Sequence, residues 1–455
     1  MTDNQVREGK AIVAALDNAP LGRQHKLFLA ALLGALIFDY SKPTTISFVI
    51  PGMRQMWNLS AVEGSYLAVA GLTGTVIGSI FWGFMADRIG RRATLLWTVA
   101  IFSVACLCGL AVEFWNSLLA CFVMGLGVGG ETPIVFSLAA EYIPARSRGR
   151  TLLFLGMVGS LAGYVFAATL ATVLRSLTAE VNVWRFMWLA QLLPGVMILI
   201  LRSKIVPESA RYLIQNGRIE EARRAAEMMI GSIRPAKEIA PETERKVAPP
   251  REAAPRLYGR TVALSFFSFA AGLANFGFVT WAPTLLGDVG FKPGEASGFL
   301  ALSALFALPA LLITGIVLDR RGTRGTLVAF AVGGGLTLVT LGVGSYTGFL
   351  TPLFVVVVTS AFFFFNTSIG GAFSFYGAEV FPTAMRVRRA GIVAALGKFG
   401  GVVGPYLGGL WLASGGNWLG LQLPLALALI TAAVVLAITG VETHKRTLEQ
   451  IAAAS

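Results

Sequence analysis

The sequence contains few of the residues from which metal, redox and catalytic sites are built. Its two histidines, His25 and His444, lie outside the long apolar segments, which excludes a histidine proton relay at the centre of a membrane. The three cysteines, Cys106, Cys108 and Cys121, lie inside apolar segments, where cysteine usually acts as a small hydrophobic side chain. No nucleophile–base pair or set of metal ligands is visible. The sequence therefore predicts neither an enzyme nor a protein that binds a metal or cofactor.

Charged residues are also scarce, at 13% of the 455 residues against about 25% in soluble proteins, while 55% are hydrophobic. This composition excludes an ordinary soluble globular protein. The formal net charge of +13 could indicate nucleic-acid binding, but the bases cluster between the apolar segments and in the tails, so we predict no nucleic-acid partner. The first 26 residues have no apolar core with a cleavage site, so we predict no signal peptide.

Twelve apolar segments are each about as long as the ~20 residues that cross a bilayer as a helix. They lie near residues 27–50, 62–86, 93–112, 116–140, 151–174, 184–204, 260–286, 296–318, 325–346, 350–378, 390–413 and 417–440. All but six of the 37 lysines and arginines lie in the tails and in the loops after even-numbered segments. Because positive residues stay on the cytoplasmic side, we predict that both termini are cytoplasmic. The sequence thus predicts an all-α, multi-pass protein of the plasma (inner) membrane.

Two motifs occur twice, about half a chain apart. The first runs from Gly83 to Arg92 and again from Gly315 to Arg324, and the second, Glu-x-x-Pro-x-x-x-Arg, begins at Glu141 and at Glu379. The two spacings, 232 and 238 residues, indicate repeated halves rather than chance. Two repeated membrane bundles are the architecture of a transporter that rocks around a central site.

The duplication divides the chain into two six-helix bundles. The predicted parts are a cytoplasmic N-terminal tail, 1–26; a first bundle, 27–204; a cytoplasmic helix and flexible linker, 205–259; a second bundle, 260–440; and a cytoplasmic C-terminal tail, 441–455.

The repeated motifs also predict a cytoplasmic gate between the bundles. Their aspartates can accept hydrogen bonds at a helix N-terminus, their glycines let helices pack closely, and their arginines stay in the cytoplasm. The alternative is that the arginines only set the topology. The predicted gate residues are Asp87, Arg88, Arg91, Arg92, Glu141, Arg148, Asp319, Arg320, Glu379 and Arg386.

One short motif is misleading. Gly125 to Gly130 fits the G-x-G-x-x-G pattern of dinucleotide-binding proteins, but it lies inside an apolar segment and follows no strand. We expect these glycines to let the segment pack closely against its neighbours.

The repeated motifs resemble the signature loops of the major facilitator superfamily, and the resemblance covers nearly the whole chain. The run Pro207 to Leu213 is similar to the motif after the sixth span of sugar-porter-like members, with Ala210 in place of the usual second proline. The resemblance implies the major facilitator fold, with twelve transmembrane helices in two six-helix bundles.

Four charged residues, Asp39, Lys42, Glu131 and Lys398, lie well inside the apolar segments. Each costs about 2.5–3.5 kcal/mol on insertion scales, so each is a candidate for function. Asp39 and Lys42 are three residues apart and share one helix face. The alternative for each residue is a structural role, as part of an ion pair or as a hydrogen-bonded acid.

Further stretches narrow the resemblance. They are Phe38-Asp39, Phe48–Pro51, Gly125–Pro133, Thr280–Leu286, Arg389–Gly391 and Gly397–Gly400. They are similar to aromatic-acid–proton symporters and to their niacin- and organic-ion-transporting relatives. Those symporters have two aspartates three apart in the first span, whereas here Asp39 is the first and Lys42 replaces the second. They have an arginine at the position of Lys398. The glutamine pair of sugar porters is missing from residues 270–276, which disfavours sugar transport.

Together these residues predict proton-coupled uptake of a small organic anion, an aromatic or other monocarboxylate. Lys42 and Lys398 would attract the carboxylate, and Asp39 and Glu131 would exchange the proton. The other predicted substrate contacts are Asn275, Phe276, Trp281, Asn366 and Tyr376. The predicted partners are the substrate, protons and the lipid bilayer, and we expect a monomer.

Three alternatives stay open. The chain could export an organic cation or drug, with Asp39 and Glu131 as counter-charges. It could carry a sugar, as its loop motifs suggest. It could be a receptor that transports nothing, although a receptor has no need of a repeated gate.

Overall fold

The computed structural model describes residues 3–193, 195–197, 205–231, 254–288, 290–381 and 386–442. Every regular element among these residues is helical. The elements are α1 (Asp3–Asn18), α2 (Arg23–Trp57), α3 (Ala61–Ile89), α4 (Arg91–Ala105), the 3-10 helix η1 (Cys106–Leu110), α5 (Phe114–Tyr142), α6 (Ala145–Leu177), α7 (Glu180–Ala190), α9 (Ala210–Gln215), α10 (Ile219–Ile230), α11 (Ala254–Asp288), α12 (Pro293–Phe306), α13 (Ala310–Tyr346), α14 (Pro352–Glu379), α15 (Arg386–Ala413) and α16 (Trp418–Thr439). Most of the predicted linker and C-terminal tail lies outside the described residues.

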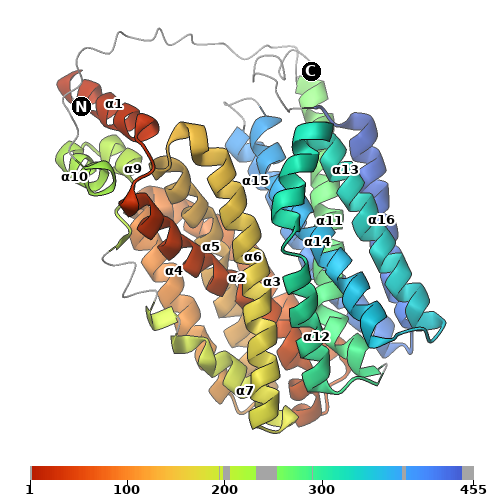
Figure 1. Cartoon of the computed structure of the whole chain (residues 1–455). Coiled ribbons are helices and arrows are strands. Elements are labelled where there is room, and N and C mark those ends of the chain that lie inside the picture. Colours follow the sequence, from red (N-terminus) through yellow and green to blue (C-terminus); the bar gives the residue numbers. More distant parts are fainter. Residues whose placement is uncertain are drawn as a thin grey trace.

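The long helices form two bundles that lie side by side (Figure 1). In the first bundle α2 packs on α6 and α3 on α5, and in the second α11 packs on α15 and α13 on α14. The bundles meet where α3 contacts α15 and where α6 contacts α12 and α14. We call the end that carries α1, α9 and α10 the tail end, and the opposite end the loop end.

Ten helical stretches of the described chain are long and apolar enough to cross a membrane. The sequence predicts twelve, and the difference falls in two places. Residues 198–204, the end of one expected span, are not described. The expected span 296–318 is broken, because α12 ends at Phe306 and α13 begins only after Pro309. Proline lacks the N–H that a continuous helix needs and clashes with the preceding turn.

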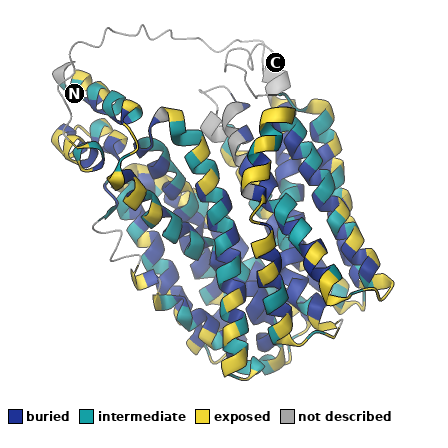
Figure 2. Cartoon of the chain, in the orientation of Figure 1, coloured by how far each residue is buried: buried dark blue, intermediate teal, exposed yellow. Residues whose placement is uncertain are grey.

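Exposed residues lie on the outside of the bundles, while the faces that the helices turn towards one another are buried (Figure 2). Large hydrophobic side chains stand exposed on this surface, among them Phe84, Leu353 and Ile438. A protein in water rarely exposes so many large apolar groups in continuous patches. The surface is therefore suited to contact with lipid.

The predicted N-terminal tail contains a helix that is fastened to the first bundle. Its apolar residues Ile12 and Leu16 are buried in a cluster with α9 and α10. Its acid Asp17 forms ion pairs with Arg148 at the start of α6 and with Arg211 of α9. The helices α1, α9 and α10 thus form a small layer at the tail end of the first bundle.

Glycines bring α3 and α5 into close contact. A methyl group on Gly78 would lie 2.2 Å from the carbonyl oxygen of Leu126, and one on Gly125 would lie 2.0 Å from that of Gly71. Both distances are far inside van der Waals contact, so only glycine fits at these positions. The Gly125–Gly130 run is therefore a helix-packing element, as the sequence indicates.

We predict that Gly78→Ala will lower the melting temperature of the protein in detergent, because the added methyl must push α3 and α5 apart. Overpacking of this kind costs about 1–3 kcal/mol. Gly83→Ala on the same helix is the matched control, since nothing lies within 4 Å of its added methyl. The control should be neutral or more stable by about 0.5–1 kcal/mol, the usual effect of replacing a helical glycine by alanine. Equal melting temperatures in the two variants would contradict the packing argument.

Candidate functional site

A cavity of about 620 Å³ lies between the two bundles. The first bundle lines it with residues of α2, α5 and α6, and the second with residues of α11, α14 and α15. Four of the predicted site residues belong to this lining: Asn275, Phe276, Asn366 and Lys398. The helices that carry them come from one bundle and face the other across the cavity.

Lys398 is the one charged residue in the described lining of the cavity. Its amino group on α15 donates a hydrogen bond to Ser79 Oγ on α3, across the contact between the bundles. Ser79 in turn bonds the carbonyl oxygen of Gly129 at 2.7 Å. The lysine is therefore held at the junction of the bundles, with its charge beside the cavity.

The cavity wall also offers oriented amide groups and aromatic rings. Asn366 Nδ2 on α14 donates to Asn275 Oδ1 on α11 at 2.8 Å. The NH₂ group of Asn275, the second N–H of Asn366 and the carbonyl oxygen of Asn366 can bond other partners. The rings of Tyr164 and Phe363 meet across the bundles with their centroids 4.4 Å apart. Together with Phe276 they give an apolar surface on which a flat ring could stack.

The two predicted acids are buried in the first bundle, outside the described lining of the cavity. Asp39 is 1% exposed and accepts a hydrogen bond from Thr132 Oγ1 at 2.6 Å, and Glu131 is fully buried. Asp39 also interacts electrostatically with Lys398. The structure therefore brings together a lysine that faces the cavity and a carboxylate behind the opposite wall.

Three other predicted substrate contacts lie away from the described lining. Lys42 turns into the first bundle, where its amino group donates to the carbonyl oxygen of Phe38 at 2.8 Å and lies 3.5 Å from the centre of the Phe102 ring. Trp281 is buried between α11 and α15 and donates to the carbonyl oxygen of Pro405 at 3.0 Å. Tyr376 lies at the tail end.

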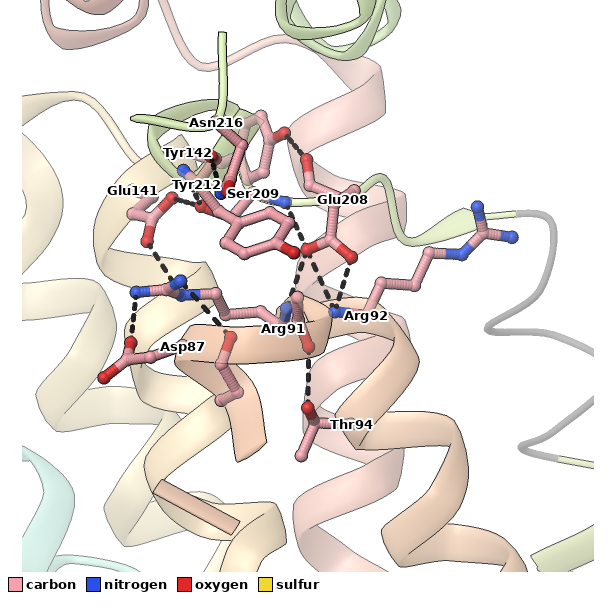
Figure 3. A network of polar contacts seen from close by, with 12 residues as sticks. Asp87, Arg91, Arg92, Thr94, Glu141, Tyr142, Glu208, Ser209, Tyr212 and Asn216 are labelled. Atoms are coloured by element: carbon pink, nitrogen blue, oxygen red, sulfur yellow. Dashed lines mark hydrogen bonds and ion pairs between the residues drawn. The ribbon is translucent and has the colours of Figure 1, made fainter. Parts of the chain in front are cut away.

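The first copy of the gate motif is part of a polar network at the tail end (Figure 3). Arg91 bonds Asp87 at 3.1 Å and lies 3.9 Å from Glu141, which accepts a hydrogen bond from Ser209. Arg88 is exposed, and its carbonyl oxygen accepts a hydrogen bond from the hydroxyl group of Tyr212 on α9. All of these partners belong to the first half of the chain.

Glu208 caps the helix that follows the first gate motif. Gly90, with φ at 97°, turns the chain between α3 and α4. Glu208 then accepts hydrogen bonds from the free backbone N–H groups of Arg91 and Arg92 at 2.8 and 3.1 Å. A carboxylate at a helix N-terminus satisfies these donors and complements the helix dipole.

The same device recurs in the second half. Gly322, with φ at 74°, breaks α13 within the second motif, and Glu442 accepts a hydrogen bond from Thr323 N at 2.8 Å. Tyr376 donates to the carbonyl oxygen of Val441 at 2.7 Å, while Tyr142 donates to the carbonyl oxygen of Glu208 in the first half. Neither glutamate was predicted from the sequence, although Glu208 and Glu442 follow the repeat spacing.

The other predicted gate residues lie in different surroundings. Arg148 pairs with Asp17 of α1 and also donates to the carbonyl oxygen of Ile143 at 3.2 Å. Asp319 and Arg320 are exposed at the tail end. The side chains of Glu379 and Arg386 lie outside the described residues.

Polar and aromatic contacts join the bundles at the loop end and in the middle. At the loop end Arg175 donates to Ser297 Oγ at 2.5 Å, and the rings of Tyr66 and Tyr406 stack at 6.5 Å. At the tail end, nothing lies within 4 Å of a methyl group added to the motif glycines Gly83 and Gly315. The cavity lining includes residues from the first turns of α6, so the cavity extends towards the tail end.

Within the described residues, no group of three or more histidine, cysteine, aspartate or glutamate side chains is placed to hold a metal ion. The site is instead built from a lysine, amides and aromatic rings.

The sequence and the fold of the chain are similar to those of known transporters. A family model described as "Sugar (and other) transporter" matches residues 37–454. The niacin transporter NiaP of Acinetobacter baylyi is 27% identical over 97% of this chain and 99% of its own length. The gallate transporter of Pseudomonas putida is 28% identical over 91% of this chain and 90% of its own, and the gentisate transporter of Corynebacterium glutamicum is 27% identical over 86% and 83%. The fold matches the partially occluded, inward-open xylose transporter XylE from E. coli with a TM-score of 0.74, at 18% identity over 92% of this chain and 98% of that one.

Proposed function

Because the chain belongs to the sugar (and other) transporter family of the major facilitator superfamily, we propose that it takes up a small organic anion together with protons. The chain is a multi-pass integral membrane protein of the bacterial plasma membrane, and a transporter rather than an enzyme. The proposed substrate is an aromatic or other monocarboxylate, carried by alternating access of the cavity to the two sides of the membrane.

The observation that carries this proposal is the lysine on the cavity wall. A carboxylate that reaches Lys398 meets a positive charge in surroundings that screen charge poorly, where attraction is stronger than in water. Phe276 and the pair of Tyr164 and Phe363 could hold a ring, and the Asn275–Asn366 pair could bond a polar group on it. Three relatives are named as transporters of niacin, gallate and gentisate, and these compounds are aromatic acids.

Asp39 supplies a physical route to proton coupling. While Asp39 is ionised, its negative charge offsets that of Lys398. Once Asp39 takes up a proton, Lys398 is left with an uncompensated positive charge beside the cavity. Proton binding then favours anion binding, and anion binding favours protonation by the same factor. Glu131 is the second candidate for the proton. It precedes Thr132, the residue that donates a hydrogen bond to Asp39.

We assign the remaining predicted contacts to packing. Lys42, Trp281 and Tyr376 are held by backbone carbonyl groups away from the described cavity lining. Export of an organic cation would call for a carboxylate on the cavity wall, where the described lining offers Lys398. A sugar carrier would bind a neutral ligand and would not depend on the lysine charge.

We further propose that the tail end is cytoplasmic and that the chain crosses the membrane twelve times as a monomer. Described bases of the loops after the second, fourth and eighth segments, among them Arg91, Arg148 and Arg320, lie at this end. The sixth crossing would then begin with α7, and α12 with the first turns of α13 would form the eighth. With the tail end in the cytoplasm, the cavity would open to the cytoplasmic side. The two motif copies would meet only when the cytoplasmic side closes, so the gate would stabilise the outward-open state.

The anion site is tested by Lys398→Ala. Loss of a charge-assisted hydrogen bond costs about 1.5–3 kcal/mol, so we expect the Kd for an aromatic carboxylate to rise about 10- to 150-fold. Lys398→Arg should keep part of the affinity, and Lys292→Ala, at the loop end, should keep all of it. Binding of nicotinate, gallate and gentisate to purified protein by calorimetry, with xylose and an organic cation for comparison, provides the measurement. An unchanged Kd in the alanine variant would sink the anion site.

Proton coupling is tested by Asp39→Asn and Glu131→Gln. Each variant fixes a neutral side chain, so we expect the loss of accumulation driven by a pH gradient in liposomes. Exchange of preloaded substrate needs no net proton movement and should survive in at least one variant. Glu113→Gln, exposed near the loop end, should accumulate substrate as the unmodified protein does. If both buried variants still accumulate substrate up a proton gradient, the protons travel elsewhere or another ion is coupled.

The gate is tested by Asp87→Asn. Exposed charge pairs contribute about 0.2–1 kcal/mol each, but several together can shift a two-state equilibrium. We expect the variant to favour the inward-open state, with slower transport and nearly unchanged binding in detergent, and Asp87→Glu to restore the balance. Spin labels on Glu220→Cys and Thr439→Cys, at the tail ends of the two bundles, report the opening. Identical label distances in variant and parent would mean that the motif only sets the topology.

A further inference from the structure

A second hollow, a groove of about 790 Å³, lies on the outside of the second bundle between α11 and α15. Its walls come from successive turns, Tyr258 to Phe269 of α11 and Arg389 to Phe399 of α15. Side chains on both walls are exposed, among them Tyr258 at 68% and Phe399 at 51%. The groove thus opens towards the surroundings of the bundle, whereas Lys398 on the other face of α15 lines the central cavity.

The tail end of the groove is polar. Arg389 donates from Nη1 to Thr261 Oγ1 at 2.6 Å, so that a guanidinium and a hydroxyl group stand side by side. Ser265 lies one helical turn further along α11 and is only 6% exposed. Its Oγ has no hydrogen-bond partner anywhere in the described chain. A buried hydroxyl without a partner is costly, and a ligand in the groove could bond it.

The rest of the groove is apolar. Val262, Phe266 and Leu396 line it, and the rings of Phe269 and Phe399 meet at its deep end with their centroids 6.1 Å apart. From Tyr258 to Phe269 the helix rises about 16 Å, at 1.5 Å per residue. This is about half of the ~30 Å hydrocarbon thickness of a bilayer. The whole groove therefore has about the length of one leaflet, with its polar end where headgroups would lie.

We propose that this groove binds an anionic phospholipid. The phosphate would lie on Arg389, whose planar guanidinium suits phosphate oxygens, and one acyl chain would run along the aromatic wall. No acidic residue belongs to the described lining, and α15 begins with the bases Arg386, Arg388 and Arg389. This charge favours a headgroup with net negative charge, since an added ammonium group would bring a second positive charge beside Arg389.

A lipid at this site would lie directly behind the helix that carries the cavity lysine. α11 and α15 touch so closely that a methyl group on Gly272 would lie 2.0 Å from the carbonyl oxygen of Gly397. An occupant of the groove would therefore brace both helices from outside. The lipid site rests on the groove alone and stands whether or not the proposed substrate is right.

The test compares lipid binding to purified, delipidated protein by native mass spectrometry and thermal unfolding. Phosphatidylglycerol should be retained and should raise the melting temperature, as any ligand of the folded state does, and phosphatidylethanolamine should do so much less. Arg389→Gln should weaken phosphatidylglycerol binding about 10- to 150-fold, the size of one charge-assisted hydrogen bond. Arg150→Gln is the matched control, an exposed arginine in the first turns of α6, the helix that corresponds to α15 in the first half.

A second variant fills the groove rather than removing its charge. Ile392 is 46% exposed on the groove wall, so Ile392→Trp should fold normally while it blocks the acyl chain. Loss of phosphatidylglycerol binding in this variant would support the proposal even if Arg389→Gln failed to fold. Three results would each overturn it: unchanged lipid retention in both variants, equal retention of the two lipids, or inorganic phosphate that stabilises the protein as well as phosphatidylglycerol does.

Discussion

The positive charge of Lys398 has to be held at a depth where an isolated ion is costly. Two groups of the other bundle offset that cost, Asp39 by its charge and Ser79 by its hydroxyl oxygen. The lysine belongs to the second bundle, so this interaction depends on how the bundles meet. One contact therefore couples the charge on the cavity wall to a buried carboxylate and to the relative position of the two halves. The close glycine packing within each bundle keeps the partners rigid enough for that coupling to matter.

Much of the helical architecture could be predicted because apolar length and repeated motifs are local properties of the sequence. The break before α13 could not, since Pro309 lies inside a stretch that is apolar on both sides and leaves the hydropathy unchanged. The packing of the N-terminal helix on α9 and α10 could not be predicted either. Its apolar residues Ile12 and Leu16 form too short a pattern to indicate that α9 and α10 would cover them.

The candidate site was predicted only in part, because the sequence shows which residues are unusual but not which way they face. Lys398 and the two asparagines line the cavity, whereas Lys42 is equally unusual and turns towards Phe102. Which face of α2 points inward is decided by its packing on α6 and α7. Tyr376 has a structural role that the repeat could have indicated, because it corresponds to Tyr142 in the first half. Each tyrosine donates a hydrogen bond to a backbone carbonyl oxygen in the segment that carries the capping glutamate. A comparison of the halves at that spacing would have pointed to a structural role and to Glu208 and Glu442.

The attachment of α1 has a practical consequence. Its contacts through Asp17, Ile12 and Leu16 are all with the first bundle, while Glu442 fastens the end of the described chain to the second. The two ends of the described chain are thus attached to different bundles. Under the proposed alternating access, the energy transfer between a fluorescent donor on α1 and an acceptor placed beside Glu442 would change with every opening of the cavity, and would report the transport cycle as an optical signal in living cells.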